Sequence, residues 1–380
     1  MYQAGCRFFN GYKPCQKNLT CNTHCPSLDI PEKSILLVHL GAMGAVLRST
    51  ALLRMIKRKY PSSFIIWVTE DHSRPLLENN PLVDKVLGLS ARDQLILSSM
   101  AFDIGFFVDK SAEVAGLQAL VNIEQSFGFT TNEKTGAIVP LNSSAQALWE
   151  LGLDNHKKFF VNQRTELELI SEALELPFAN DEYLLALREG ERDVSDQRRR
   201  EWSQDGKFKL IGLNTGTSGV LPFKTIPIFI WRDIIARLNQ ERAFKVVLLG
   251  GSSDQERNQI IGSGHSVIQS PTNSGLRDGM CSIAATDVVI TADSLGMHMA
   301  IALQKKIVAW FGPTCAHEMD LYGRGIKLKS SMACSPCWKR NCDQAQPCCD
   351  RIDTHEVVSS VKNIMGLNLK QSFNDQCASF

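Results

Sequence analysis

The sequence predicts an α/β protein with two doubly wound, Rossmann-like domains that face a cleft, preceded by a cysteine-rich N-terminal extension. From Lys33 onward, continuous apolar runs alternate with amphipathic helical segments, and the alternation starts again near residue 207 after a polar, charged stretch. Buried apolar strands separated by helices are typical of a parallel sheet covered on both faces. Two such series predict two sheets, whose ligands would bind beyond the carboxyl ends of the strands.

The domain boundaries are expected where this pattern changes. They give a cysteine-rich module at 1–32, a first Rossmann-like domain at 33–200, a second at 201–366 with a cysteine-rich segment at 334–349, and a tail at 367–380. A chain of 380 residues commonly holds about two domains.

The elements follow in order along the chain. In the first domain we expect strands at 34–40, 63–70, 83–89 and 102–109, and helices at 46–60 and 112–124. Helices and polar connections fill 141–206. In the second domain, strands with their loops are expected within 207–216, 244–254, 287–293 and 306–314, and helices at 228–240, 255–261, 276–285 and 294–303.

Composition and charge limit the function classes. A formal net charge of +1 argues against a nucleic-acid-binding surface. No apolar run reaches the roughly 18 residues that cross a bilayer, and the N-terminus lacks the charged and apolar regions of a signal peptide. We therefore expect a cytoplasmic protein, and a peripheral membrane association stays open.

Glycine-rich loops follow strands in the second domain. In "NTGTSGVLPFK" the small residues leave backbone N–H groups accessible, and Lys224 can reach an anion such as a diphosphate. In "VVLLGGSSD", Gly250 and Gly251 let a ligand approach the backbone, whereas Asp254 suits a helix cap. An ordinary glycine-rich loop with a surface lysine is the alternative for the first of these stretches.

A third loop, in "VVITADSLGMHMAIAL", leads from a strand into a helix. Ser294 lies near the helix N-terminus, whose free N–H groups attract anions. Asp293 would repel a diphosphate, so we expect it to accept hydrogen bonds from hydroxyls or from the turn. His298 is either a ligand contact or a half-buried structural histidine, and Glu318, after "WFGPT", could accept from a sugar hydroxyl.

These motifs together resemble glycosyltransferase family nine, the ADP-heptose:acceptor heptosyltransferases of the GT-B fold. The resemblance runs from about Lys33 to Lys362 and rests on "LGAMGAVLRSTALLRMIKRKYP", "VTEDHSRPLLENNPLVDKV", "LNTGT…FK", "LLGGSSDQERN", "VVITADSLGMHMAIAL" and "AWFGPT". It implies inverting transfer of a heptose from ADP-heptose to a hydroxyl without a catalytic metal. The acceptor is usually the lipopolysaccharide inner core, reached at the inner face of the inner membrane. One branch of the family glycosylates autotransporter proteins and carries cysteine-bound iron. An oligomer stays open.

The resemblance also implies roles for individual residues. Lys224 matches the lysine that neutralises the leaving ADP. The loop at Gly41, Met43 and Gly44 would lie on the acceptor side. The family's Thr-Gly after the aspartate is Ser-Leu in this chain, with Gly296 one position later, so the turn differs in detail. The implied donor-binding residues are Thr215, Gly216, Thr217, Lys224, Gly250, Gly251, Asp293, Ser294, Leu295, Gly296 and His298.

Position 45 departs from the family. The loop normally carries an aspartate there, taken as the general base that deprotonates the acceptor hydroxyl, but this chain has Ala45. An alanine cannot accept a proton. Three interpretations stay open: an engineered inactive form, a different base such as Asp109, or a sugar-nucleotide or glycan-binding protein without turnover.

Nine of the twelve cysteines fall in two short windows near the ends of the chain. The first contains Cys6, Cys15, Cys21 and Cys25, with His24 as a further ligand, and the second contains Cys334, Cys337, Cys342, Cys348 and Cys349. In a reducing compartment such spacing favours metal sites over disulfides. Thiolates suit zinc, iron or an iron–sulfur cluster in a structural role, and reduced free thiols are the alternative.

Overall fold

A computed structural model describes residues 2–9, 11–15, 17–18 and 20–367. The chain divides into two compact units, one formed by Met1–Lys158 with Glu166–Ala186 and the other by Phe159–Thr165 with Leu187–Phe380. The predicted boundary at residue 200 lies inside a helix of the second unit. The predicted tail lies, apart from Leu367, outside the described residues.

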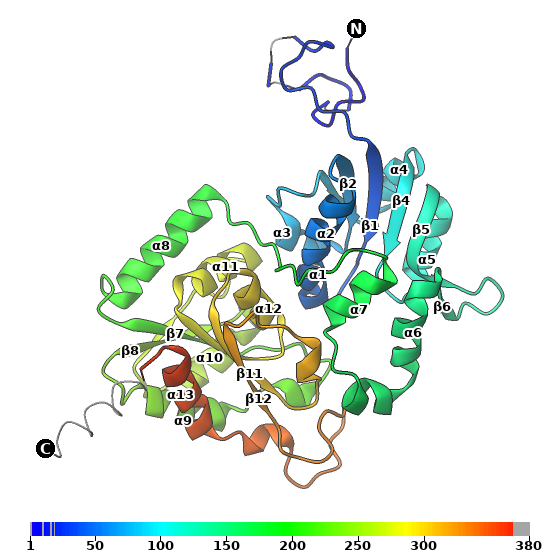
Figure 1. Ribbon diagram of the computed structural model, residues 1–380. Coiled ribbons are helices and arrows are strands. Elements are labelled where there is room, and N and C mark those ends of the chain that lie inside the picture. Colours follow the sequence, from blue (N-terminus) through cyan, green and yellow to red (C-terminus); the bar gives the residue numbers. More distant parts are fainter. Residues whose placement is uncertain (1, 10, 16, 19, 368–380) are drawn as a thin grey trace, which may run out of the picture. The chain divides into compact units, whose positions relative to one another are not determined.

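The first unit contains a six-stranded sheet in the order β3-β2-β1-β4-β5-β6 (Figure 1). All neighbouring strands are parallel except β5 and β6. The strands are β1 (Lys33–Val38), β2 (Ser63–Val68), β3 (Lys85–Leu87), β4 (Ala101–Phe107), β5 (Asn122–Thr131) and β6 (Ile138–Pro140). The central strand β1 is fully buried from Ile35 to Val38, which explains its uninterrupted apolar sequence.

Helices cover both faces of this sheet. Alternate residues of β1 point to opposite faces, so Leu36 and Val38 pack with Leu97 and Val114 from α4 and α5. The helices are α1 (Met43–Ser49), α2 (Ala51–Lys59), α3 (Arg74–Leu77), α4 (Ala91–Ser98), α5 (Ala112–Leu120), α6 (Gln146–Leu153) and α7 (Glu166–Ala173), with 3₁₀ turns η1 (Asp71–Ser73) and η2 (Ser143–Ala145). A π-helical turn, η3 (Lys157–Val161), spans the point where the chain changes units.

Two of the expected helices differ from the structure. The helix expected at 46–60 begins at Met43 and is divided at Thr50 into α1 and α2. The helix expected at 112–124 ends at Leu120, because residues from Asn122 onward form β5 and pair with β4. Pairing with a neighbouring strand outweighs the local helical pattern there.

The second unit contains a six-stranded, fully parallel sheet in the order β12-β11-β10-β7-β8-β9. The strands are β7 (Lys209–Asn214), β8 (Phe244–Leu249), β9 (Val267–Gln269), β10 (Val288–Ala292), β11 (Lys306–Phe311) and β12 (Gly325–Lys329). The short edge strands β9 and β12, like β5 and β6 in the first unit, are absent from the sequence-based expectation.

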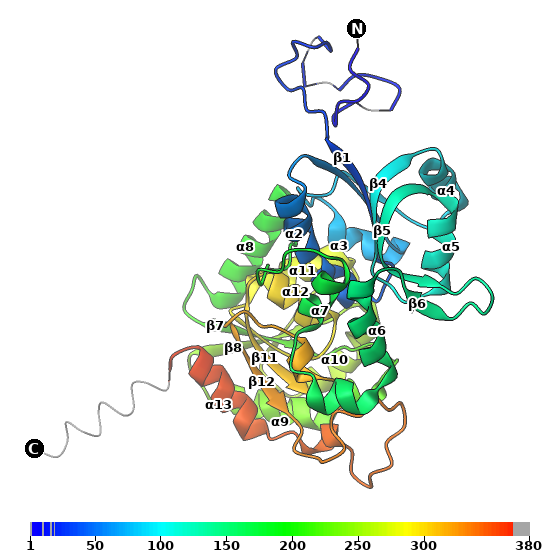
Figure 2. The same ribbon diagram turned by 45° about the vertical axis from the view of Figure 1, so that its right-hand side comes forward.

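In the second unit, α9 and α13 lie on one face of the sheet and α8, α11 and α12 on the other (Figure 2). On the first face, Trp231 of α9 is fully buried against the strands. On the second, Arg198 and Arg199 of α8 pair with Asp278 and Asp287. The helices are α8 (Glu189–Ser203), α9 (Ile228–Leu238), α10 (Gln255–Gly262), α11 (Leu276–Ala285), α12 (Leu295–Ala302) and α13 (Thr354–Ile364), with short turns η4 (Pro222–Lys224), η5 (Ser252–Asp254), η6 (Ala316–Glu318) and η7 (Cys348–Arg351).

Within the described part of the chain, no helix combines the length and the apolar composition that a bilayer-spanning segment requires.

Candidate active site

The predicted donor-binding loops converge in the second unit. They leave the carboxyl ends of β8, β7 and β10, which are adjacent in the sheet. The structure therefore brings together Thr215 to Lys224, Gly250 with Gly251, and Asp293 to His298. In a parallel sheet this edge is where ligands bind.

Asn214, which the sequence analysis did not single out, joins two of these loops. Its side-chain Nδ2 donates to Thr291 Oγ1 at 3.1 Å, to Ser294 Oγ at 2.9 Å and to the carbonyl oxygen of Gly216 at 3.2 Å. A Cβ at Gly296 would lie 2.3 Å from Asn214 Oδ1. A glycine is therefore required at position 296. The sequence signal that could have identified Asn214 is its place at the end of a buried strand.

The side chain of Asp254, in the loop after β8, packs closely against the loop after β7. Its Oδ2 accepts a hydrogen bond from the N–H of Gly251 at 2.8 Å, and a Cβ at Gly216 would lie 2.3 Å from that oxygen. Thr215, which is 1% exposed, donates to Asn258. Asp254 therefore caps a turn, and Thr215 supports the loop from inside.

Lys224 and Asp293 form the main charged pair of this region. Lys224 Nζ lies 3.2 Å from Asp293 Oδ2, and the two side chains are only 16% and 13% exposed. Burial opposes ionisation of Asp293, but Lys224, His298 and the hydroxyl of Thr314 outweigh it and lower the pKa of the carboxyl. The expectation for Asp293 was incomplete, because its charged partner is Lys224. A carboxylate held this way orients the ammonium group of Lys224.

Ser294 and His298 lie at the start of α12. Ser294 is the N-cap residue, and its carbonyl oxygen accepts from the backbone N–H of His298 at 3.3 Å. His298 is 6% exposed, and its charge contributes to the lowered pKa of the Asp293 carboxyl. A cavity of about 590 Å³ in the same unit is lined in part by Thr314 and His317.

In the first unit, Asp109 lies beside the loop that follows β1. Its Oδ2 accepts from the backbone N–H of Leu40 at 2.7 Å, and the N–H of Gly41 also stabilises the carboxylate. The side chain is 12% exposed. Burial raises the pKa of Asp109 to about 6, despite these hydrogen bonds. A carboxylate with a pKa close to working pH is suited to general-base chemistry.

His39 is a further residue of this region that the sequence analysis did not select. Its Nδ1 lies 2.7 Å from Ser49 Oγ, and its Nε2 lies 3.8 Å from Asp109 Oδ1. Burial, aided by the charge of Arg48, lowers the pKa of His39 to about 3. The imidazole is therefore neutral near pH 7 and forms no ion pair with Asp109. Arg48 itself pairs with Glu166 at 2.8 Å.

Ala45 lies in the first turn of α1, because the helix begins at Met43 and not near residue 46. The N–H of Ala45 donates to the carbonyl oxygen of Ala42 at 2.8 Å. Ala42 is exposed and Ala45 is partly buried, so Ala42 is the more exposed residue of this turn. An aspartate at position 45 would occupy a helix N-terminal site that favours negative charge.

The second cysteine window separates into two parts. Cys349 belongs to the core beneath η7, where burial, followed by Asp350, raises the pKa of its thiol to about 12. For Cys348 the pKa is raised to about 11 by burial first, and then by the neighbouring thiols of Cys337, Cys342 and Cys334. The side chain of Cys348 is only partly buried and packs against the same core, which does not include Cys334, Cys337 or Cys342.

A different set of ligand atoms is close together near η6. Among the described residues, one group of three side chains has ligand atoms that all lie within 4.8 Å of one another, namely Cys315, His317 and Glu318. Glu318 is 6% exposed, so it is an interior residue, which disfavours the expected contact with a sugar hydroxyl.

The fold and the site define the class of protein. Each unit contains a doubly wound sheet whose strands are parallel, apart from the β5–β6 pair. The second unit also carries glycine-rich loops and an oriented lysine at its strand ends. These are the features of a glycosyltransferase with the GT-B fold. The chain belongs to glycosyltransferase family 9 (heptosyltransferase), whose profile matches residues 97–346.

Individual relatives agree with this family. Lipopolysaccharide heptosyltransferase 2 of Salmonella typhimurium is 25% identical over 297 residues, which cover 74% of this chain and 83% of that protein. A family 9 glycosyl transferase from Veillonella parvula superposes with a TM-score of 0.72 at 17% identity, covering 89% of this chain and 98% of that one. The iron-containing dodecameric heptosyltransferase TibC of enterotoxigenic E. coli, solved with ADP-D-β-D-heptose, superposes with a TM-score of 0.52 at 10% identity, covering 94% and 84%.

Proposed function

We propose that the chain transfers a heptose from ADP-heptose to a hydroxyl of the lipopolysaccharide inner core, with inversion at the anomeric carbon. The observation that carries the proposal is the partly buried Lys224–Asp293 pair, placed where the glycine-rich loops after β7, β8 and β10 meet. The relative from Salmonella is a lipopolysaccharide heptosyltransferase, and TibC was solved with ADP-D-β-D-heptose. Both names agree with this donor and this class of reaction.

Lys224 would act on the leaving group. As the bond between the anomeric carbon and the diphosphate oxygen breaks, negative charge develops on ADP. An ammonium group that is already oriented by Asp293 stabilises that charge without reorganisation, and it does so more strongly in a water-poor site than in water. The backbone N–H groups of the loop at Gly216 would contribute in the same way.

Asp109 would act on the acceptor. The hydroxyl oxygen forms the new bond to the anomeric carbon while its proton passes to a carboxylate. With Ala45 in the chain, position 45 cannot accept that proton. The raised pKa of Asp109, its partial exposure and its place beside the loop at Gly41 favour it as the base.

Turnover tests the proposal directly. The full chain, incubated with ADP-heptose and a phosphorylated inner-core acceptor, is expected to release ADP and to extend the acceptor by one heptose. If donor binds and neither the unchanged chain nor the Ala45→Asp variant releases ADP, the enzyme assignment is refuted. The chain is then a sugar-nucleotide-binding protein, which is the alternative from another class.

A second acceptor class is supported by the likeness to TibC and by the abundance of cysteine. In that alternative the heptose is transferred to hydroxyls of an autotransporter protein. Co-expression with such a protein and intact-mass measurement distinguishes the two acceptors, because protein transfer adds the mass of whole heptose residues. We also propose that the protein acts at the cytoplasmic face of the inner membrane and that it assembles into an oligomer. Cell fractionation tests the location, and light scattering tests the oligomeric state.

The second cysteine window suits a structural metal. We assign Cys334, Cys337, Cys342 and Cys348 as thiolate ligands of zinc or iron, because the CxxC spacing of the first two suits a metal and Cys348 is less deeply buried than Cys349. The N–H of Cys337 donates to the carbonyl oxygen of Pro313 at 3.1 Å, which holds the CxxC turn against the loop after β11. Cys337→Ser is expected to remove one metal equivalent and destabilise the second unit, whereas Cys349→Ser keeps the metal. Equal metal contents in both variants would contradict this ligand set.

A further inference from the structure

The four cysteines of the N-terminal module surround one small cavity. Cys6, Cys15, Cys21 and Cys25 all line it, together with apolar side chains such as Leu28. The space open to the centre of a water-sized sphere is about 10 Å³, which corresponds to about one water-sized occupant. Nothing in the GT-B fold or in the proposed reaction uses this cavity.

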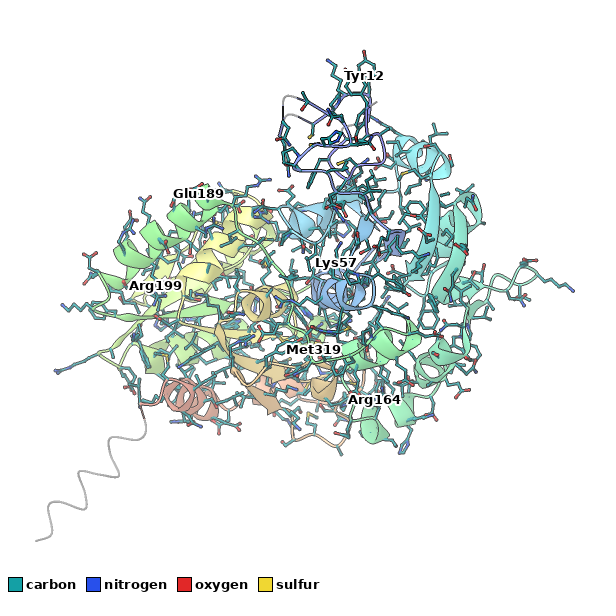
Figure 3. All side chains as sticks on the ribbon, turned by 45° about the horizontal axis from the view of Figure 1, so that its top comes forward. Tyr12, Lys57, Arg164, Glu189, Arg199 and Met319 are labelled. Atoms are coloured by element: carbon teal, nitrogen blue, oxygen red, sulfur yellow. The ribbon has the colours of Figure 1, made fainter. Side chains whose placement is uncertain are left out.

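The module has little else to hold it together. Its described residues, 2–9, 11–15, 17–18 and 20–32, form turns and bends without a helix or an extended strand (Figure 1). Tyr12 projects into solvent at the outer end of the module and is 88% exposed (Figure 3). Segments of fewer than about 40 residues usually need disulfides, metals or a partner surface to fold. The cysteines described in this module form no disulfides.

Two of the cysteines lie at tight turns, and one sulfur accepts a hydrogen bond. The carbonyl oxygen of Cys6 accepts from the N–H of Phe9 at 2.9 Å, and that of Cys25 accepts from Leu28 at 3.0 Å. Asn18 Nδ2 donates to Cys25 Sγ at 3.3 Å. Donors aimed at sulfur stabilise the thiolate form and orient metal ligands. His24 is exposed and does not line the cavity, so it is left out of the set.

The residue after Cys6 attaches the module to the first unit. Arg7 Nε lies 2.8 Å from Asp29 Oδ2, its Nη1 lies 2.6 Å from Asp84 Oδ1, and its Nη2 donates to the carbonyl oxygen of Ser63 at 2.9 Å. The Arg7 side chain is 15% exposed. A guanidinium that meets two carboxylates and a carbonyl group needs a fixed backbone to keep this geometry.

We propose that Cys6, Cys15, Cys21 and Cys25 bind one structural zinc or iron ion as thiolates, and that this ion fixes Arg7 on the first unit. Metal–sulfur bonds of about 2.3 Å in a tetrahedron place the sulfurs roughly 3.8 Å apart. In the structure these four thiols are not yet at that spacing, so binding the ion would reorient the cysteine side chains around the cavity. The energy of metal binding then becomes folding energy of the module.

Metal analysis of the full chain tests the ligand set. Cys6→Ser and Cys21→Ser are each expected to contain one metal equivalent less than the unchanged protein. Cys281→Ser, at a buried cysteine of α11, is the matched control and should keep the full content. Cobalt-substituted protein should show thiolate-to-cobalt charge-transfer absorption that the Cys6 variant loses in part.

Other measurements keep the proposal falsifiable if a variant folds poorly. Thiol titration of the unchanged protein, denatured with a chelator and without reductant, should find all twelve cysteines of the sequence. A count of four fewer thiols would indicate two disulfides and would overturn the proposal. Stoichiometric acid-labile sulfide that is lost in Cys6→Ser would also overturn it, because it would indicate an iron–sulfur cluster in place of a single ion. Arg7→Ala should keep the metal while lowering the melting temperature. Loss of metal in the Arg7→Ala variant would refute the proposal that the ion fixes Arg7, because it would mean that Arg7 is needed to hold the ion.

Discussion

Asp103 in β4 and Asp109, two residues after the end of β4, provide a matched pair for testing the base. Asp109 Oδ2 accepts from the N–H of Leu40 at 2.7 Å, and Asp103 Oδ2 accepts from the N–H of Ser34 at the same distance. Asp103 therefore joins β4 to β1, and Asp109 joins the loops that follow these two strands, at the opposite end of the strand pair. The pKa of Asp103 is lowered to about 2, above all by the hydrogen bond from Ser34, whereas burial raises that of Asp109 to about 6.

The difference predicts opposite effects on stability. Since Asp109 has a higher pKa in the folded state than its ordinary 3.8, the folded protein binds the proton more tightly, and stability falls as pH rises from about 4 to 6. The full difference corresponds to about 3 kcal/mol at higher pH. Asp109→Asn removes this cost while its amide oxygen can still accept from Leu40. We expect the free energy of unfolding to increase by about 1 kcal/mol at pH 8, and the gain to vanish near pH 4.

Asp103→Asn should behave in the reverse way. The lowered pKa of Asp103 means that its carboxylate contributes stability above pH 4, and that this contribution is lost as pH falls toward 2. The variant is therefore expected to lower the free energy of unfolding at pH 8. Because Asp103 lies at the amino end of β4, transfer activity should be unchanged.

Kinetics completes the comparison. Loss of a general base typically costs roughly 10²- to 10⁴-fold in rate, so Asp109→Asn should lower kcat by that order. In the unchanged chain, kcat/KM should fall about tenfold for each pH unit below about 6, as Asp109 becomes protonated. Initial rates of ADP release and urea unfolding curves at pH 4 and pH 8 provide both readouts. A fully active and more stable Asp109→Asn variant would refute the assigned role and leave Asp109 as a buried structural acid.

Three further predictions concern single positions. Ala45→Asp should change kcat less than tenfold if Asp109 is the base, and a rise of about 10²-fold or more, measured by ADP release, would restore position 45 to the role it has in the family. Lys224→Ala should weaken ADP binding by tenfold or more in calorimetry, since a charged hydrogen bond contributes about 1.5–3 kcal/mol. The control is Lys245→Ala, which changes a lysine that lies over the Phe208 ring in the same unit and should have no effect on ADP binding. Gly296→Ala should lower the free energy of unfolding by about 1–3 kcal/mol in thermal unfolding, because the added Cβ meets the amide of Asn214, which joins β7 to α12. Gly279→Ala, at a helical position with open space around it, is the control and should be neutral or stabilising. Equal effects of the two substitutions would contradict the close packing at Gly296.

The sequence by itself determined the fold class, because the relevant patterns are local. Apolar runs such as 35–38 and 288–292 can only be buried between two layers of helices. The order of glycine-rich loops after these strands, together with Lys224, led to the prediction of a donor side, and the structure brings these loops to one edge of the sheet. Edge strands such as β9 were not predictable, since three residues carry no period of their own and pair only with a strand that is already in place.

Only the tertiary structure decided which polar groups meet. Asn214 reaches Thr291 and Ser294 across 77 and 80 positions of the chain, and no spacing in the sequence announces such contacts. The charge states of Asp109 and His39 depend on how deeply neighbouring elements bury them, and burial is a property of the packed sheet and helices, not of the residue. The same holds for the cysteines: the sequence determined that there are two windows, whereas three-dimensional packing decided that Cys349 is buried in the core and Cys348 lies partly buried against it.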